Sequence, residues 1–221
     1  MTAAPEEPGS ESSEPTGPQV VRGSGDAAVA AAAERSAFTA GLNIADVPAL
    51  PTTADTANLR LGAHLSDSNL IILPLVGVWR GEGEFVAPGS DVAVRFGQQV
   101  TISHDGRGFL RHESVMWLLD DAKTPASREL GWWRPQPDGE IELLIAHSEG
   151  VVEVFYGRAT SLTSWNLSTD AVVRTTTAPS VTGATRLYGV VDGKLAYVEE
   201  RATVEHALHP HTSALLERVA G

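Results

Sequence analysis

The sequence predicts an all-β protein, a closed antiparallel up-and-down β-barrel of about ten strands preceded by a short N-terminal helix. From residue 77 onward, short runs rich in Val, Thr, Trp, Tyr and Phe recur, which is the residue usage of strands. Turn-forming residues separate these runs and no long helical pattern lies between them, so parallel strands joined by crossover helices are disfavoured. Closure would remove the exposed edges of such a sheet, and a barrel of this size can enclose one ligand.

The segments before the strands are expected to contribute little to the core. Residues 1–40 are predicted to form a disordered or partly helical tail, because the first part is rich in Pro, Glu, Ser and Gly and the stretch 27–40 has high helix propensity. Residues 41–65 contain prolines and glycines and are expected to be an irregular arm. In 66–76, capping residues precede apolar ones, which predicts a short helix at the start of the barrel domain.

The barrel domain is predicted to span residues 66–221, with hairpin turns between its strands. Strands are expected at 78–87, 93–103, 108–118, 128–134, 139–147, 150–158, 161–168, 170–175, 182–191, 194–204 and 211–219. The clearest turns are Asp105-Gly106, Asp138-Gly139, Glu149-Gly150 and Asp192-Gly193. Pairing of the first strand with the last would close the barrel and bring Arg218 near Trp79, where the guanidinium can stack on the indole.

Composition excludes several classes of function. The chain has no cysteine, which rules out disulfides, thiolate metal sites, a thiolate haem ligand and cysteine nucleophiles. A net charge of −12 repels phosphate backbones and anionic lipid surfaces, so neither nucleic acid nor a membrane is an expected partner. No apolar run approaches the roughly 20 residues that cross a bilayer. We therefore expect a cytoplasmic protein. The sequence leaves a monomer and a homodimer as alternatives.

The first predicted strand carries a Gly-x-Trp-x-Gly-x-Gly motif formed by Gly77, Trp79, Gly81 and Gly83. Glycine at alternate positions empties one face of a strand, which allows tight curvature or the close approach of another element. Trp79 then has room to plug one end of a barrel. Because a buried Trp is usually part of a core, the motif is predicted to be structural.

Three histidines, His206, His209 and His211, lie close together in the C-terminal segment. Neutral imidazole is a common ligand of metals and of haem iron, although a lone histidine is more often solvated or hydrogen-bonded. A zinc site formed by all three is disfavoured, because Pro210 interrupts the strand geometry that would place two of them on one face. The residues alone leave solvated, zinc-binding and haem-binding roles open.

Three parts of the chain, taken in order, resemble one known family. They are the motif in 77–83, the central segments 129–134 (ELGWWR) and 141–154 (IELLIAHSEGVVEV), and the end of the chain at 210–218 (PHTSALLER). Together they are similar to the nitrobindin family of haem-binding β-barrels, also described as peroxynitrite isomerases and as fatty-acid-binding-protein-like domains. The resemblance covers about residues 66–221 and does not extend to the segment before them.

The resemblance implies a site for ferric haem b in which His211 is the axial ligand of the iron. Where family members often have a lysine against the haem, this chain has Thr185, followed by Arg186. In place of the family's Tyr-Pro-Thr segment, the chain offers Ser90. His147 matches a histidine of the central strands whose role the resemblance does not name.

The strand pattern around His211 leads to further expectations. Ser213 and Leu215 follow His211 at period two, so all three are predicted to share one face of the last strand. If that face is the interior, His211 points into the cavity. His206 and His209 fall outside the matched position and are expected to be solvated loop residues.

The resemblance implies isomerisation of peroxynitrite to nitrate, with reversible nitric oxide binding as the associated function. A single imidazole leaves the other axial position of the iron open. An apolar pocket on that side, without a strong acid or base, would disfavour peroxidase chemistry and permit small nitrogen species to reach the iron. The alternative is a haem-free carrier of a fatty acid or another small apolar ligand, since such carriers also begin with a Gly-x-Trp strand.

Overall fold

The computed structural model describes residues 24–42, 49–90 and 92–221, and the chain divides into two compact units, Met1–Ala49 and Leu50–Gly221. In the first unit, α1 (Ser24–Thr39) is followed by the short 3-10 helix η1 (Ala40–Leu42). The predicted N-terminal helix is therefore confirmed, whereas residues 1–23 of the predicted tail lie outside the described residues. None of the described helices is long and apolar enough to cross a membrane.

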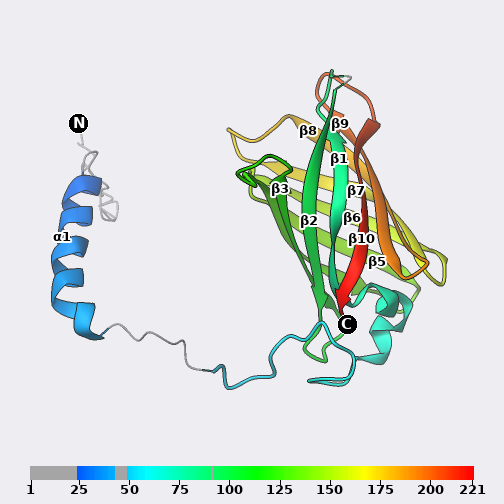
Figure 1. Ribbon diagram of the computed structural model, residues 1–221, viewed down its shortest axis with the longest axis horizontal. Helices are drawn as coiled ribbons and strands as arrows, with labels where there is room; N and C mark the ends of the chain where they lie inside the picture. The colour runs from blue at the N-terminus through cyan, green and yellow to red at the C-terminus, as the bar shows by residue number, and fades with distance from the viewer. Residues whose placement is uncertain (1–23, 43–48, 91) are drawn as a thin grey trace, which may run out of the picture. The chain divides into compact units, whose positions relative to one another are not determined.

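The second unit is a closed barrel of ten antiparallel strands, as the sequence predicts (Figure 1). The 3-10 helix η2 (Asp67–Leu75) precedes the barrel and lies where the short helix is expected. The strands are β1 (Gly77–Val86), β2 (Ala93–Ser103), β3 (Leu110–Leu118), β4 (Pro125–Pro135), β5 (Glu140–His147), β6 (Val151–Ser161), β7 (Ser164–Arg174), β8 (Val181–Val191), β9 (Lys194–Thr203) and β10 (His209–Ala220). Each strand pairs with its neighbours in sequence, and β1 pairs with β10 to complete the ring.

The seam between β1 and β10 confirms the predicted closure. Trp79 pairs with Arg218 in the register of the two strands, and the Arg218 guanidinium carbon lies 3.9 Å from the centre of the Trp79 ring. The same guanidinium donates hydrogen bonds to the carbonyl oxygens of Pro74, at 2.9 Å, and Val76. A Cβ added to Gly81 would lie 2.3 Å from a carbonyl oxygen of β10, so the glycine allows the close approach that the motif predicts.

One strand differs from the prediction. Segments 161–168 and 170–175 are expected as separate strands, but they form the single strand β7. Val154 pairs with Ala171 and Phe155 with Thr169, so Asp170 is the extra residue of a β-bulge. A bulge bends a strand without ending it. A polar residue at the bulge therefore led the sequence pattern to predict two strands instead of one.

The end of the barrel next to η2 is filled by the apolar core. Trp79, Trp133 and Trp165 are fully buried there, and η2 contributes Ile72 and Leu75. The indole nitrogen of Trp79 donates to a carbonyl oxygen of η2 at 2.8 Å, and that of Trp165 does so at 2.9 Å. Trp79 therefore plugs this end as predicted, and any ligand must enter from the other end.

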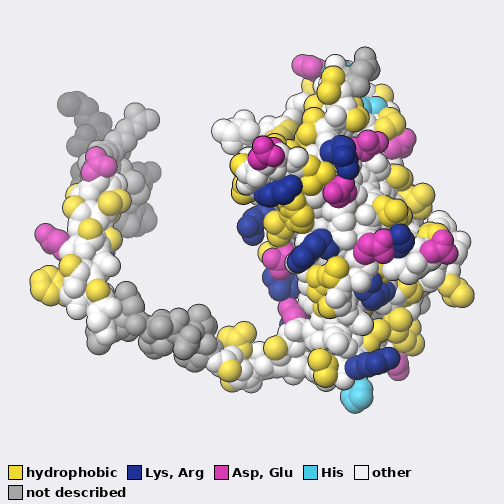
Figure 2. Space-filling view, in the orientation of Figure 1, with side chains coloured by type: hydrophobic (Ala, Val, Ile, Leu, Met, Phe, Trp, Pro, Cys, Tyr) yellow, Lys and Arg dark blue, Asp and Glu magenta, His cyan; other side chains and the backbone are white. Residues whose placement is uncertain are grey.

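The outer face in view in Figure 2 carries acidic and basic side chains interspersed with apolar ones. Exposed ion pairs join neighbouring strands, as in Arg95 with Glu82 at 2.5 Å and Lys194 with Glu217 at 2.5 Å. Such exposed pairs contribute little stability, so the interior decides the energetics of the fold.

Candidate functional site

A cavity of about 250 Å³ opens at the end of the barrel opposite η2, where the β1–β2 hairpin and the β9–β10 loop lie (Figure 1). Its apolar wall includes Phe85, Met116, Val151, Val181 and Tyr197. Its polar wall includes Ser127, Glu129, His147, Glu149, Glu199, Arg201, His211 and Thr212. The expectation of an apolar pocket without acid or base is therefore wrong for this cavity, because inward positions of β4, β5 and β9 carry ionisable side chains.

His211 lines the cavity at a β-bulge in β10. On the partner strand β9, Pro210 pairs with Glu200 and Thr212 pairs with Glu199, so His211 is the extra residue between them. Bulges often re-aim a side chain next to a functional site. The bulge is thus the local feature that brings His211 to the cavity.

The bulge also makes the period-two prediction for β10 wrong. Alternation predicts that Ser213 and Leu215 share a face with His211, but Leu215 is 53% exposed. The core residues of this strand are instead Ala214 and Leu216. One inserted residue shifts the alternation by one position, and a shift of one moves every side chain to the opposite face.

His211 is held as a neutral imidazole, and its Nε2 has no hydrogen-bond partner among the described residues. Its Nδ1 lies 2.8 Å from the carbonyl oxygen of Val86, which can only accept, so Nδ1 carries the proton and Nε2 the lone pair. Burial lowers the pKa of His211 below its usual value, and the nearby positive charge of Arg201 lowers it further. A neutral ring, oriented through Nδ1 and free at Nε2, fits the axial ligand of a haem iron.

Ion pairs cross the barrel interior next to the cavity. Arg186, on β8, lies 2.7 Å from an oxygen of Glu129 on β4 and 2.9 Å from an oxygen of Glu199 on β9. Arg201, also on β9, lies 2.6 Å from the second oxygen of Glu199. Arg186 is only 2% exposed, so its charge is compensated by these carboxylates and not by water.

The pKa values of the two carboxyl groups reflect these pairs. Burial alone would raise the pKa of Glu129, but Arg186 and the hydrogen bond from His112 hold it well below its usual range. Burial opposes ionisation of Glu199 in the same way, and Arg186 and Arg201 nevertheless lower its pKa. Both carboxyl groups are therefore ionised at neutral pH and fix the two guanidinium groups in place.

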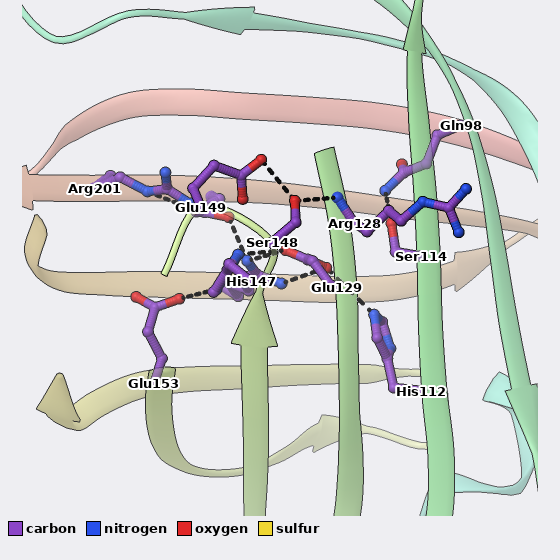
Figure 3. Close-up of polar contacts among 12 residues, drawn as sticks. Gln98, His112, Ser114, Arg128, Glu129, His147, Ser148, Glu149, Glu153 and Arg201 are labelled. Atoms are coloured by element: carbon purple, nitrogen blue, oxygen red, sulfur yellow. Dashed lines mark hydrogen bonds and ion pairs between the residues drawn. The ribbon is translucent and has the colours of Figure 1, made fainter. Parts of the chain in front are cut away.

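His147, the last residue of β5, lines the cavity. Its ring lies between the carboxylates of Glu153 and Glu129 (Figure 3). Its Nε2 lies 2.7 Å from Glu153 Oε2, and its Nδ1 lies 3.5 Å from Glu129 Oε1. The ring is oriented by β4 and β6, the strands on either side of β5.

Three of the residues predicted to bind the cofactor do not line the cavity. Thr185 lies on the outer side of β8, where its Oγ is 3.3 Å from Glu200. Arg186 points inward but is engaged by the carboxylates described above. Ser90 lies in the β1–β2 turn, where its hydroxyl oxygen accepts the backbone N–H of Val92 at 3.0 Å. Arg201, by contrast, lines the cavity.

The other two C-terminal histidines are separate from this site. His206 is exposed in the β9–β10 loop, as predicted. His209 is half-buried at the start of β10 rather than solvated, and its Nδ1 lies 2.9 Å from the carbonyl oxygen of Ala207. Within residues 24–42, 49–90 and 92–221, no three His, Cys, Asp or Glu side chains are grouped to hold a metal ion, which gives the zinc interpretation no support.

Sequence reasoning missed the ionisable residues of the interior, although alternation carries a signal for them. Ile141, Leu143 and Ile145 face inward, and His147 continues their phase. On β6, Glu153 stands at the same phase as two buried apolar residues. A charged residue on the apolar phase of a strand is therefore the pattern that could have identified the site.

The comparisons with known proteins identify the family. The family model of the THAP4-like, heme-binding beta-barrel domain matches residues 69–218, and the chain belongs to this family. A ferric nitrobindin-like protein of Saccharopolyspora erythraea is 55% identical over 207 residues, covering 92% of this chain and 98% of the relative. Peroxynitrite isomerase 1 of Mycobacterium marinum is 52% identical over 217 residues, covering 93% of this chain and 96% of the relative. The crystal structure of Rv2717c from M. tuberculosis superposes with a TM-score of 0.64 at 26% identity, over 70% of this chain and 98% of that one.

Proposed function

We propose that the chain binds ferric haem b in the cavity through Nε2 of His211, isomerises peroxynitrite to nitrate and binds nitric oxide. The observation that carries the proposal is the His211 imidazole, which lines the cavity with Nδ1 engaged by a backbone carbonyl and Nε2 unpaired among the residues that the structure describes. Membership of a haem-binding family and relatives named peroxynitrite isomerase support it. A haem-free carrier would have no use for an oriented, neutral imidazole in the cavity wall.

When bound, the haem supplies the iron that promotes cleavage of the peroxynitrite O–O bond. The chain supplies the rest. His211 would hold the cofactor, and apolar residues such as Phe85 and Met116 would exclude water from the bound substrate. Arg201 lines the cavity and is better placed than Thr185 to meet the propionate groups.

Substitution of the ligand tests the proposal directly. We expect His211→Ala to lose the Soret band of the ferric protein after haem loading and gel filtration, because apolar contacts do not hold the iron itself. His206→Ala and His209→Ala are matched controls from the same segment and should keep the wild-type spectrum. An unchanged spectrum in His211→Ala, or a wild-type protein without a Soret band, would contradict the proposal. The second of these outcomes would favour the carrier.

We further propose that the protein acts in the cytoplasm on small molecules, without a nucleic-acid or membrane partner. The net charge of −12 and the absence of cysteine support this part of the proposal. Co-sedimentation with anionic vesicles, or a shift of DNA mobility at physiological salt, would contradict it.

A homodimer is also part of the proposal, and the outer face of β4 to β7 supports it. Leu130 pairs with Ala146, which pairs with Val152, which pairs with Val173, so an apolar row crosses four strands. Trp132 stands beside this row and is 41% exposed. Contiguous exposed apolar surface is typical of association sites. Light scattering should give a dimer that Trp132→Glu converts to a monomer, and a monomeric wild type would contradict the assignment.

A further inference from the structure

Met116 brings a thioether to the wall of the cavity. The chain has no cysteine and two methionines, Met1 and Met116. Met116 lines the cavity that His211, the proposed haem ligand, also lines. Thioether sulfur is polarizable and takes up an oxygen atom to form a sulfoxide. Among the described side chains that line the cavity, Met116 is therefore the one that can accept an oxygen atom in a single two-electron step.

The alternation of β3 turns the Met116 side chain inward. Met116 pairs with Gln98 of β2, which is 2% exposed, and Ser114, two residues earlier on the same face of β3, is fully buried. Gln98 donates a hydrogen bond to Ser114 at 2.9 Å inside the barrel (Figure 3). On the outer face, Trp117 covers Gly97, where an added Cβ would lie 2.3 Å from the Trp117 ring. The thioether therefore belongs to the interior and not to the outer surface.

The strand pairing next to Met116 is irregular. A register shift between Val115 and Trp117 leaves two residues of β4, Ala126 and Ser127, opposite Met116 alone. Both of these residues line the cavity. Bulges of this kind are frequent at the rims of barrels and next to active sites. Because Met116 is only half-buried, a small ligand that enters from the open end of the barrel can reach its sulfur.

We propose that Met116 is a modification site, at which peroxynitrite held in the cavity oxidises the thioether to methionine sulfoxide. The inference rests on the proposed function, which brings this oxidant into the cavity. The sulfur attacks the terminal peroxide oxygen, so an S–O bond forms, the O–O bond breaks and nitrite leaves with the electron pair. Sulfur loses two electrons and peroxynitrite gains them, so the step needs no further reactant. This side reaction yields nitrite, whereas isomerisation yields nitrate.

Oxidation of Met116 changes the character of the cavity wall. A sulfoxide is polar, whereas the thioether that it replaces is apolar and flexible. Phe85 and Val181 line the same cavity, and a polar group next to such side chains favours the entry of water. We expect each chain to isomerise a limited number of peroxynitrite molecules before its own substrate oxidises Met116 and lowers its rate.

The experiment follows the full chain loaded with ferric haem through repeated additions of peroxynitrite. Peptide mapping by mass spectrometry should show the gain of one oxygen atom at Met116. The wild type should release about one nitrite per chain more than Met116→Leu, which has a side chain of similar volume but no sulfur. The isomerisation rate of the wild type should fall in proportion to the fraction of oxidised Met116, whereas Met116→Leu should keep its own starting rate.

Leu215→Met is the matched control for oxidation from bulk solution. Leu215 is 53% exposed on the outer side of β10, so a thioether introduced there meets solvent more than Met116 does but lies outside the cavity. In this variant, Met116 should be oxidised at least about 10-fold faster than the introduced methionine, a small part of what holding two reactants together contributes. Equal or faster oxidation of the introduced methionine would show that the cavity plays no part and would overturn the inference.

The remaining outcomes separate this inference from the proposed function. Conversion of peroxynitrite to nitrate by a wild-type chain whose Met116 stays unoxidised would refute the inference and leave the haem site intact. Complete oxidation of Met116 without a loss of rate would refute the limit on turnover. A wild-type chain that has no Soret band, or that does not form nitrate, would refute the proposed function itself.

Discussion

Replacement of Arg186 by methionine should destabilise the barrel more at neutral pH than in acid. Met has nearly the length of Arg but no charge, so Arg186→Met removes the 2.7 Å contact to Glu129 and the 2.9 Å contact to Glu199. Glu199 keeps Arg201 as a partner, whereas the described partners that remain to Glu129 are His112 and His147. Breaking a buried pair in this way costs about 3–5 kcal/mol, which in a domain of this size lowers the Tm by about 6–20 °C.

The dependence on pH follows from the two carboxyl groups. In the wild type their pKa values are lowered, so the stability they contribute is present above their ordinary pKa and is lost as the pH falls through the lowered values. In Arg186→Met, burial is no longer opposed by the guanidinium, and the pKa of Glu129 should rise above its ordinary value. The folded variant then takes up a proton more readily than the unfolded chain, so it gains stability as the pH falls.

Urea unfolding followed by circular dichroism, at neutral pH and at about pH 5, measures both effects. The difference in unfolding free energy between wild type and Arg186→Met should become smaller at the lower pH. Arg80→Met is the matched control, because Arg80 is exposed on β1, and it should change stability by less than about 0.5 kcal/mol at either pH. A loss of unfolding free energy of the same size at both pH values would refute the reasoning, because it would mean that unpaired carboxylates do not cause the loss.

Three further predictions concern the seam, a glycine and the ligand. Arg218→Met should lower the free energy of unfolding by about 2 kcal/mol in urea titrations, because it removes hydrogen bonds to two carbonyls and the stacking on Trp79; no change would contradict a role in closure. Gly131→Ala should be far more destabilising than Gly193→Ala in thermal melts, because its Cβ would lie 1.9 Å from a carbonyl oxygen, whereas Gly193 has nothing within 4 Å and only a positive φ. Haem release on acidification should begin only at a pH below the usual pKa of histidine. The pKa of His211 is lowered, and protonation of the imidazole competes with iron binding only below this lowered pKa. Haem release already at neutral pH would contradict this prediction.

Alternation and turn residues were sufficient to predict most of the barrel. Nine of the ten strands fall on predicted segments, and the exception, β7, was divided because Asp170 is a bulge residue that resembles a loop residue locally. His211 shows the same limit. The role proposed for it follows from the family resemblance, but the direction of its side chain depends on an inserted residue in β10 that period-two counting cannot register.

The interior ion pairs were beyond sequence reasoning for a different reason. Arg186 and Glu129 are 57 residues apart and lie on strands that are not neighbours in the ring. Each is recognisable only as a polar residue on an inward phase, and their pairing depends on the curvature of the closed barrel. Thr185 shows a limit of the family resemblance. It matches a family position expected to meet the haem, but the match does not say which side of the strand the residue occupies in this chain.

The seam between β1 and β10 has a consequence for how the chain folds during synthesis. Nine of the ten strand pairings join neighbours in sequence and can form as local hairpins, but the Arg218 to Val76 contact spans 142 residues. Closing so long a loop is slow, and β10 is the last strand to leave the ribosome. Until it arrives, β1 presents an unpaired edge of backbone donors and acceptors. The charged residues Arg80, Glu82 and Glu84 on the outward side of that strand would then discourage pairing with another nascent chain.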